Sequence, residues 1–304
     1  MHSPVPREEF IKKFSDYLRE HYYSDQAPEY FQTGEFENSI NEQTHKRSDR
    51  FSEYLIPWIG RVFDLNGTDM LEIGSGTGAS TQAFAPFCNS ISCYEIDQKS
   101  VRAAKARAEL SGWANVSFED EPFGKACRFA QQGRRADIVS FVGVLEHMPF
   151  EIVMDTLSTA FDALRPGGVI VITDTPNRLS PFDYHTSWIP FFQWLPVEVQ
   201  RQYYRRSDRP HFVFDVSDVE KQAPWEVPGR LRGWGNGVSF HEFELALGTR
   251  VHDMIVADGW EDEIVKLSNV FDDDHWLLDM FEKMNVKAHK AFARSWLHLI
   301  IQKP

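Results

Sequence analysis

A glycine-rich segment followed by an acidic residue has the clearest chemistry in this sequence. Gly74, Gly76 and Gly78 occupy every second position of LEIGSGTG at 71–78, after a predicted strand and before a predicted helix. Glycine lets the backbone approach a ligand closely, and the start of a helix offers unpaired N–H groups. Glu95 ends the next predicted strand, 17 residues beyond Gly78, where its carboxylate can accept hydrogen bonds from two ribose hydroxyls. Together they predict a nucleoside-bearing cofactor at the carboxyl edge of a sheet.

The spacing of the glycines separates two cofactor classes. A nicotinamide dinucleotide site prefers G-x-G-x-x-G, in which the third glycine packs the helix under a pyrophosphate. Residue 79 is an alanine, and the glycines of this segment do not fit the G-x-G-x-x-G spacing in any alignment. This disfavours a dehydrogenase. Glu72 lies two residues before the first glycine. An acid at this position suits a cofactor that carries an ammonium group instead of a diphosphate.

Four segments, taken in order, resemble the class I S-adenosylmethionine-dependent methyltransferases: LEIGSGTG at 71–78, YEID at 94–97, DIVSFVGVLEHM at 137–148 and ALRPGGVIVITDTPN at 163–177. The resemblance implies that S-adenosylmethionine is the cofactor and that Glu72 lies near its amino group. It also implies that Glu95 holds the ribose. The other cofactor-binding residues implied are Gly74, Ser75, Gly76 and Gly78 at the methionine and ribose, and Ile96, Asp120, Glu121, Val142 and Gly143 around the adenine.

The methyl acceptor requires a second set of residues. Methyl transfer from a sulfonium is an in-line displacement, and a hydroxyl acceptor must also lose a proton, for which histidine is the first choice of base. His147 follows the fourth predicted strand, and His185 lies in a segment that should fold over the acceptor. Asp174 ends the fifth predicted strand. These three residues are the predicted catalytic residues, and each histidine could instead have a purely structural role.

The sequence shows no clustered set of metal ligands. Asp174 and Asn177 are expected to point towards one crevice, where they could orient a histidine, bind an acceptor or, with other oxygens, hold a magnesium ion. Because no further ligands group with them in the sequence, we expect no metal.

Apolar runs that alternate with helical patterns predict the fold. The runs at 69–74, 90–95, 116–119, 137–142 and 168–173 read as strands covered on both faces. We therefore expect an α/β fold, a Rossmann-like doubly wound sheet of seven mainly parallel strands. Residues 165–168, RPGG, read as a turn. Near the end we expect a helix at 248–258, a strand at 263–267, a helix within 274–293 and a last strand at 296–301.

The same patterns divide the chain into four parts. They are an N-terminal helical segment (1–66), the S-adenosylmethionine-binding core (67–177), a cap insertion that binds the acceptor (178–247), and a C-terminal part that completes the sheet (248–304). Six of the 13 residues from 182 to 194 are aromatic, which indicates a small core of the cap or a pocket for a sugar or lipid. A basic cluster in the cap is either solvated or binds a phosphate: Arg201, Arg205, Arg206 and Arg209.

Composition excludes several classes of protein. The chain has 45 Asp and Glu against 32 Lys and Arg, a net charge of −13, which argues against nucleic acid as a partner. Three cysteines without a CxxC pair indicate a reducing compartment. With no signal peptide and no apolar run long enough to span a membrane, we expect a cytoplasmic protein.

The function predicted is therefore S-adenosylmethionine-dependent methylation of an oxygen on a small molecule, a sugar or polysaccharide, or a lipid-linked intermediate. The segment PNRLSPFDYHTSWIPFFQWLP at 176–196 also resembles bacterial methyltransferases, some of them associated with surface polysaccharide. N- or C-methylation and a noncatalytic S-adenosylmethionine-binding scaffold stay open as alternatives. An aromatic-rich cap could also pair with its copy in a homodimer.

Overall fold

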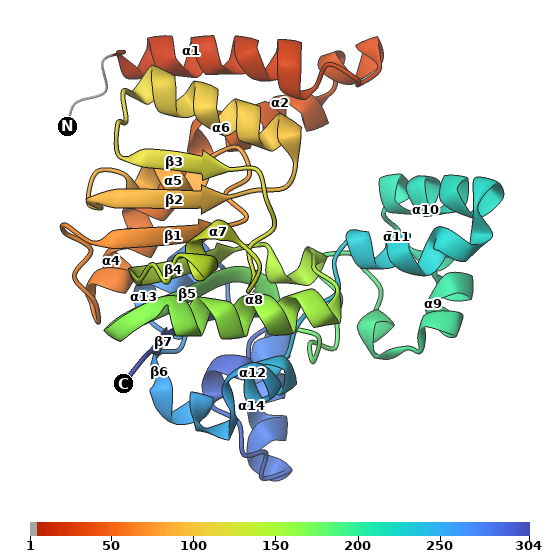
Figure 1. The fold of residues 1–304 in the computed structure, drawn as a ribbon. Coiled ribbons are helices and arrows are strands. Elements are labelled where there is room, and N and C mark those ends of the chain that lie inside the picture. The colour runs from red at the N-terminus through yellow and green to blue at the C-terminus, as the bar shows by residue number, and fades with distance from the viewer. Residues whose placement is uncertain (1–4) are drawn as a thin grey trace.

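Seven strands form one sheet in the order β3-β2-β1-β4-β5-β7-β6 (Figure 1). The structure is a computed structural model that describes residues 5–304; residues 1–4 of the predicted N-terminal segment lie outside it. Strand β7 is antiparallel to both β5 and β6, and the other pairings are parallel. The predicted sheet is confirmed. Its strands are β1 Asp69–Ile73, β2 Ser90–Tyr94, β3 Val116–Glu119, β4 Ala136–Val142, β5 Leu164–Pro176, β6 Ile255–Ala257 and β7 Trp296–Gln302.

Helices cover both faces of the sheet because alternate residues of each strand point to opposite sides. Leu71 and Ile73 of β1 join a cluster with α8 (Phe150–Ala163), α12 (Phe240–Leu247) and α14 (Asp272–Lys283). Met70 joins the other cluster, with α4 (Ile56–Gly60), α5 (Ala79–Phe84) and α13 (Asp262–Leu267). The central strands are continuous apolar runs because they are buried on both faces of the sheet.

The N-terminal segment is helical, as predicted. It contains α1 (Arg7–Tyr17), α2 (Gly34–Asn41), α3 (Arg47–Arg50) and α4 (Ile56–Gly60), joined in part by π-helical turns at Leu18–Tyr22, Glu42–Lys46 and Phe51–Leu55. Helix α1 lies along α6 (Gln98–Ser111) (Figure 1), where Phe10 and Phe14 pack on Ala103. The N-terminal helices are thus attached to the sheet through the helix that follows β2.

The segment between β5 and β6 leaves the sheet layers. Figure 1 shows α9 (Val197–Tyr203), α10 (Pro210–Gln222) and α11 (Val227–Gly233) to one side of the sheet. They enclose a cluster of their own, built around Phe192, Tyr204 and Phe212. Helix α12 follows and returns to pack on α8. We refer to residues 178–239 below as the cap segment. Some of the aromatic residues of the cap segment therefore belong to this cluster.

Two local predictions are wrong. Residues 263–267, predicted as a strand, lie in helix α13, and the edge strand β6 is Ile255–Ala257, inside the range predicted as a helix. Both runs are too short for periodicity to separate strand from helix. Residues 165–168 also differ from the predicted turn, because they belong to β5, where Gly167 has a φ of 78° and donates its N–H to the Lys303 carbonyl. Short helix α7 (Arg128–Gln131) precedes β4.

Candidate active site

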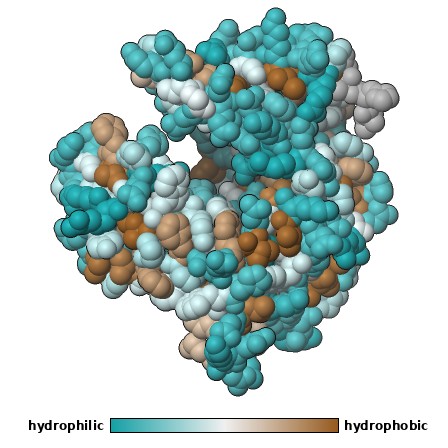
Figure 2. Space-filling view, turned by 180° about the vertical axis from the view of Figure 1, so that it is seen from behind, coloured by the Kyte–Doolittle hydropathy of each residue, from teal (hydrophilic) through white to brown (hydrophobic). Residues whose placement is uncertain are grey.

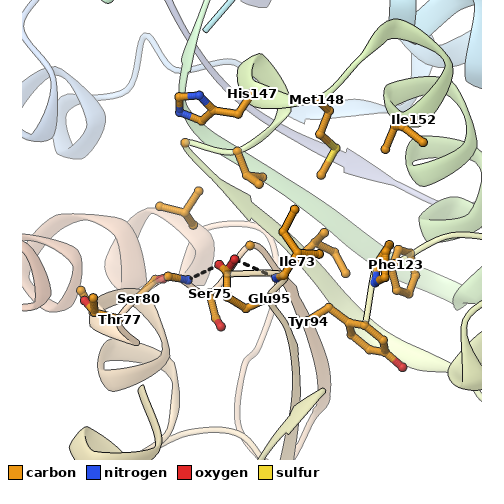
Figure 3. A pocket seen from close by; sticks show the side chains of 18 of the residues that line it. Ile73, Ser75, Thr77, Ser80, Tyr94, Glu95, Phe123, His147, Met148 and Ile152 are labelled. Carbon is orange, nitrogen blue, oxygen red and sulfur yellow. Dashed lines mark hydrogen bonds between the residues drawn. The ribbon is translucent and has the colours of Figure 1, made fainter. Parts of the chain in front are cut away.

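A cavity of about 460 Å³ opens at the carboxyl ends of β1, β2 and β4. Figure 3 shows the glycine loop and Glu95 on one side of it, and His147, Met148 and Ile152 on the other. A volume in this range is typical of cofactor and small-ligand sites. We call this space the donor cavity. Its lining includes these predicted residues: Gly74, Ser75, Gly76, Glu95, Ile96, Glu121, Val142 and Gly143.

The glycine loop needs glycine for steric reasons. At Gly74 the φ angle is 72°, and a Cβ atom would lie 2.3 Å from Cγ2 of Val144. Gly76 also has a positive φ, of 53°, with nothing near its missing Cβ, so the space beside it is free for a ligand. The loop therefore presents bare backbone to the donor cavity, as the sequence predicts.

Glu95 is the acidic partner of that loop. Its carboxylate accepts the N–H of Gly76 at 2.9 Å, and it also accepts the N–H groups of Ile96 at 2.8 Å and Asp97 at 2.9 Å. An ionised carboxylate has about four acceptor sites, so one remains for a ribose hydroxyl without loss of these bonds. Together with the bare glycine backbone, this free acceptor fits the nucleoside part of S-adenosylmethionine.

Three predicted cofactor residues lie away from the lining. Among residues 5–304, the lining of the donor cavity does not include Glu72, Gly78 or Asp120. Gly78 instead precedes α5 with a φ of 81°, and a Cβ there would lie 3.3 Å from Arg107. Near Asp120, the residues that line the cavity are Glu121, Pro122 and Phe123.

Glu72 is buried behind the loop, at 1% exposure. Its Oε2 accepts the hydroxyl of Thr81 at 2.5 Å and the thiol of Cys93, whereas Oε1 has no partner. Burial, the largest effect, raises the pKa of this carboxyl. The structure therefore places Glu72 behind the glycine loop and not in the lining that a cofactor amino group would touch.

Two walls of the donor cavity come from the N-terminal helices, which our sequence analysis did not include in the site. Tyr22, Gln43 and Arg47 all line it. Gln43 accepts the hydroxyl of Thr77, in the glycine loop, at 2.6 Å. No motif marks these residues in the sequence, because their position depends on how distant helices pack.

Arg107 of α6 holds these parts together. Its buried guanidinium donates to the carbonyl oxygens of Thr77 at 2.8 Å, of Thr44 at 3.2 Å and of Gln43. It also donates to the side chain of Gln82 at 2.6 Å. Burial without a carboxylate partner lowers the pKa of Arg107 to about 9. The glycine loop and the N-terminal helices therefore share one buried donor.

A second cavity adjoins the first. It has a volume of about 460 Å³ and shares four lining residues with the donor cavity: Gln43, Arg47, Gly143 and His147. It brings together all three predicted catalytic residues, which are His147, His185 and Asp174. We call it the acceptor cavity. Figure 2 shows an open hollow between the N-terminal helices and the cap segment.

Asp174 lies in this acceptor cavity with an unusual backbone. Its φ of 54° is in the left-handed region, which is uncommon for a residue other than glycine. One carboxylate oxygen lies 3.8 Å from a guanidinium nitrogen of Arg47. Burial raises the pKa of Asp174, and the charges of Arg47 and Arg50 oppose the rise.

Three other residues considered in the sequence are absent from the lining of this cavity: Asn177, Arg205 and Arg209. The Asn177 amide donates to the carbonyls of Phe292 at 2.7 Å and Arg294 at 2.8 Å, so it fixes the chain after β5 instead of facing the crevice. The predicted pairing of Asp174 and Asn177 in one crevice is therefore wrong. In the cap segment, Arg205 pairs with Glu220, and Arg209 donates to the carbonyls of His185 and Thr186.

Glu146, which is not among the predicted site residues, lines the acceptor cavity. It is 2% exposed, and burial raises the pKa of its carboxyl to about 8. Its Oε1 lies 3.7 Å from Nε2 of His147 and 3.9 Å from Nε2 of His185. Burial lowers the pKa of His147, and it lowers that of His185 to about 4, so both imidazoles are neutral at pH 7.

The part of the chain that matches a known family lies within the predicted core, residues 67–177. Residues 71–170 match the family described as the methyltransferase domain. A ubiquinone biosynthesis O-methyltransferase from Leptothrix cholodnii is 25% identical over 149 residues, 46% of this chain and 61% of that protein. One of the same name from Cupriavidus pinatubonensis is 25% identical over 126 residues, covering 41% and 48%. This chain thus spans about half to three fifths of these relatives.

Solved structures show a weaker likeness. The N-methyltransferase NodS from Bradyrhizobium japonicum, in complex with S-adenosylhomocysteine, has a TM-score of 0.36 at 18% identity, over 54% of this chain and 74% of that one. Among residues 5–304, no helix has the length and hydropathy needed to cross a bilayer. Residues 71–170 therefore match a methyltransferase domain, and the strand order and the glycine loop agree with the class I S-adenosylmethionine-dependent fold that the sequence resembles.

Proposed function

We propose that this protein transfers the methyl group of S-adenosylmethionine to an oxygen atom of a small-molecule acceptor. The observation that carries the proposal is the contact between the two cavities. The donor cavity holds the glycine loop and Glu95, the acceptor cavity holds Glu146, Asp174 and His185, and His147 lines both. Two substrates bound in adjoining cavities can meet in line, which supplies much of the rate enhancement of a displacement reaction.

The chemistry needs a proton acceptor on the acceptor side. The cofactor supplies a methyl group on a positively charged sulfur, and the sulfur keeps the electron pair of the broken C–S bond. As the new C–O bond forms, the acceptor hydroxyl loses its proton. The neutral histidines and Asp174 lie in the acceptor cavity and can take it.

The acceptor class follows from the lining of that cavity. Arg47, Arg50 and Asp174 make it polar, and Trp296 offers one flat apolar surface. Such a lining suits a ring that carries hydroxyl groups, either aromatic or sugar. The names of the two curated relatives place them in ubiquinone biosynthesis as O-methyltransferases, which favours oxygen over nitrogen or carbon. The free, buried cysteines Cys88, Cys93 and Cys127 support a cytoplasmic location.

Calorimetric titration with S-adenosylmethionine, S-adenosylhomocysteine and NAD tests the cofactor. We expect saturable binding of the first two and none of NAD. Turnover is then measured as S-adenosylhomocysteine released in the presence of phenolic, catecholic and sugar acceptors, each with a matched O-methylated control. Cofactor binding with no turnover of any acceptor would favour the noncatalytic scaffold. Tight NAD binding without a response to S-adenosylmethionine would overturn the proposal.

A further inference from the structure

Three potential metal ligands meet where the cap segment touches the sheet. A carboxylate oxygen of Glu146 and one ring nitrogen each of His147 and His185 all lie within 4.8 Å of one another. Glu146 and His147 come from the turn after β4, whereas His185 comes from the cap segment. The hydrogen bonds around the two imidazoles determine what these atoms can do.

The tautomer of His147 is fixed by a backbone carbonyl. Its Nδ1 lies 3.1 Å from the carbonyl oxygen of Gly233. A carbonyl only accepts, so Nδ1 carries the hydrogen and Nε2 is left with a lone pair. That lone pair belongs to the atom 3.7 Å from Oε1 of Glu146.

The tautomer of His185 is fixed in the same way through a hydroxyl. The Thr186 hydroxyl donates to the carbonyl of Gly235 at 2.6 Å, so its oxygen accepts from the Nδ1–H of His185, 3.1 Å away. The Nε2 atom of His185 therefore also has a lone pair, on the atom 3.9 Å from Oε1 of Glu146. Imidazoles that bind metals commonly donate their other N–H to such an oxygen.

The carboxylate of Glu146 lacks a full set of partners in the protein. Its Oε2 is buried without a hydrogen-bond partner. Its Oε1 faces the two imidazole lone pairs, and a cation bound among these three atoms would pair with the buried carboxylate. We propose that Glu146, His147 and His185 bind a divalent transition-metal ion, and that oxygen atoms of the methyl acceptor complete its coordination.

The ligand set indicates which ion. Imidazole nitrogens favour zinc, iron and similar ions over magnesium or calcium, which prefer oxygen ligands. Two atoms bound to one zinc at about 2.0–2.1 Å lie about 3.3 Å apart in a tetrahedral site. Oε1 of Glu146 lies 3.7 and 3.9 Å from the two Nε2 atoms, and all three ligand atoms lie within 4.8 Å of one another, so the side chains must contract around the ion. Three protein ligands leave at least one position open, as in catalytic metal sites.

The charges around the site are mixed. Asp174 adds a second carboxylate to the same cavity, and Arg47 and Arg50 bring two positive charges. Asp174 is 3.8 Å from Arg47, which offsets part of the repulsion between that guanidinium and an ion. A metal-bound acceptor oxygen loses its proton more readily. Asp174 lies in the same cavity and can receive that proton while both histidines are engaged as ligands.

Metal binding is tested without measuring turnover. The metal-free full-length protein is titrated with Zn²⁺ by calorimetry and with Co²⁺ by visible absorption, whose intensity reports four- or five-coordinate geometry. We expect one ion per chain. We also expect Glu146→Gln, His147→Asn and His185→Asn each to weaken binding at least tenfold. His147 is 45% exposed, so its replacement leaves the packing intact even if the other two variants unfold.

A second histidine–carboxylate pair provides the matched control. Nε2 of His252 lies 2.8 Å from Oε1 of Glu244, outside both cavities, and His252→Gln should change affinity by less than twofold. No saturable ion in the wild type, or unchanged binding in His147→Asn, would overturn the site. The role of the ion for the acceptor rests on the proposed methyl transfer. A stoichiometric ion with no turnover of any acceptor would therefore refute the proposed function and leave the site standing.

Discussion

A Cβ atom on Gly235 would lie 2.6 Å from Cε1 and 2.7 Å from Nδ1 of His185. The φ angle of Gly235, 117°, is also one that side chains rarely allow. Gly235→Ala should therefore push His185 away from Glu146 and destabilise the fold by about 1–3 kcal/mol. We expect turnover to fall at least tenfold, measured as S-adenosylhomocysteine release, and the unfolding midpoint in urea to fall as well.

Gly229 of α11 provides the control for that substitution. Nothing lies within 4 Å of its missing Cβ, and its φ is not positive. Gly229→Ala should leave turnover unchanged and stabilise the protein by up to about 1 kcal/mol, because alanine is the better helix former. Equal effects of the two substitutions would show that the contact with His185 is not what matters.

Glu95→Ala should weaken S-adenosylhomocysteine binding by about 1–3 kcal/mol, which is about 5- to 150-fold in Kd. The substitution removes the acceptor expected for the ribose and also releases the N–H of Gly76 in the glycine loop. Glu95→Gln, which keeps one acceptor oxygen, should lie between the wild type and Glu95→Ala. Calorimetry measures all three, with the exposed Glu109→Ala as control. Affinity within twofold of wild type in Glu95→Ala would remove Glu95 from the cofactor site.

Glu72→Gln should change how stability depends on pH in the protein without ligand. Burial raises the folded pKa of Glu72 above its usual 4.5, so the folded state favours the protonated carboxyl. The stability that this carboxyl contributes is present below pH 4.5 and is lost as the pH rises through the folded pKa. A neutral glutamine avoids that loss. The variant should therefore gain on the order of 1 kcal/mol relative to wild type between pH 5 and pH 8.

Urea denaturation of both proteins at the two pH values measures this gain. A difference between Glu72→Gln and wild type that is the same at pH 5 and pH 8 would show that Glu72 binds a proton equally in the folded and unfolded states.

Arg107→Met should destabilise the protein by about 2–4 kcal/mol, because carbonyl oxygens of Thr77 and Thr44 lose a charged donor. Cofactor affinity should fall too, since Thr77 belongs to the glycine loop. Urea denaturation and calorimetry give the two numbers. Arg102→Met, on the exposed side of the same helix, should cost less than about 0.5 kcal/mol. If both arginine variants behave alike, the buried contacts of Arg107 carry no stability.

The central sheet could be predicted from sequence because its strands are buried on both faces. β1, β4 and β5 read as continuous apolar runs, and the connections between them must be right-handed and helical. The edge strand β6 has only three residues and one neighbour, so no such pattern marks it. That is why the prediction failed between residues 248 and 267.

The donor side of the site was predictable for a related reason. Gly74, Gly76 and Glu95 follow neighbouring parallel strands, so their meeting at one edge is dictated by topology. The acceptor side depends on tertiary contacts. Glu146 meets His185 through contacts that hold the cap segment on the turn after β4, such as the backbone N–H of Asn236 that donates to the Glu146 carbonyl at 2.8 Å. No spacing in the sequence encodes that contact.

The contacts of the Arg107 guanidinium also determine which segment of this chain could be exchanged with that of a relative. It donates to carbonyls on both sides of the predicted boundary between residues 66 and 67. The glycine loop and residues 43–44 are therefore held together by one side chain. A chimera that exchanged only residues 71–170 with a relative would place a foreign loop against this chain's Gln43 and would also replace Arg107, so the carbonyls of Gln43 and Thr44 would lose their donor. The segment of this protein that must be exchanged as a whole therefore begins inside the N-terminal helices, well before the methyltransferase motifs themselves.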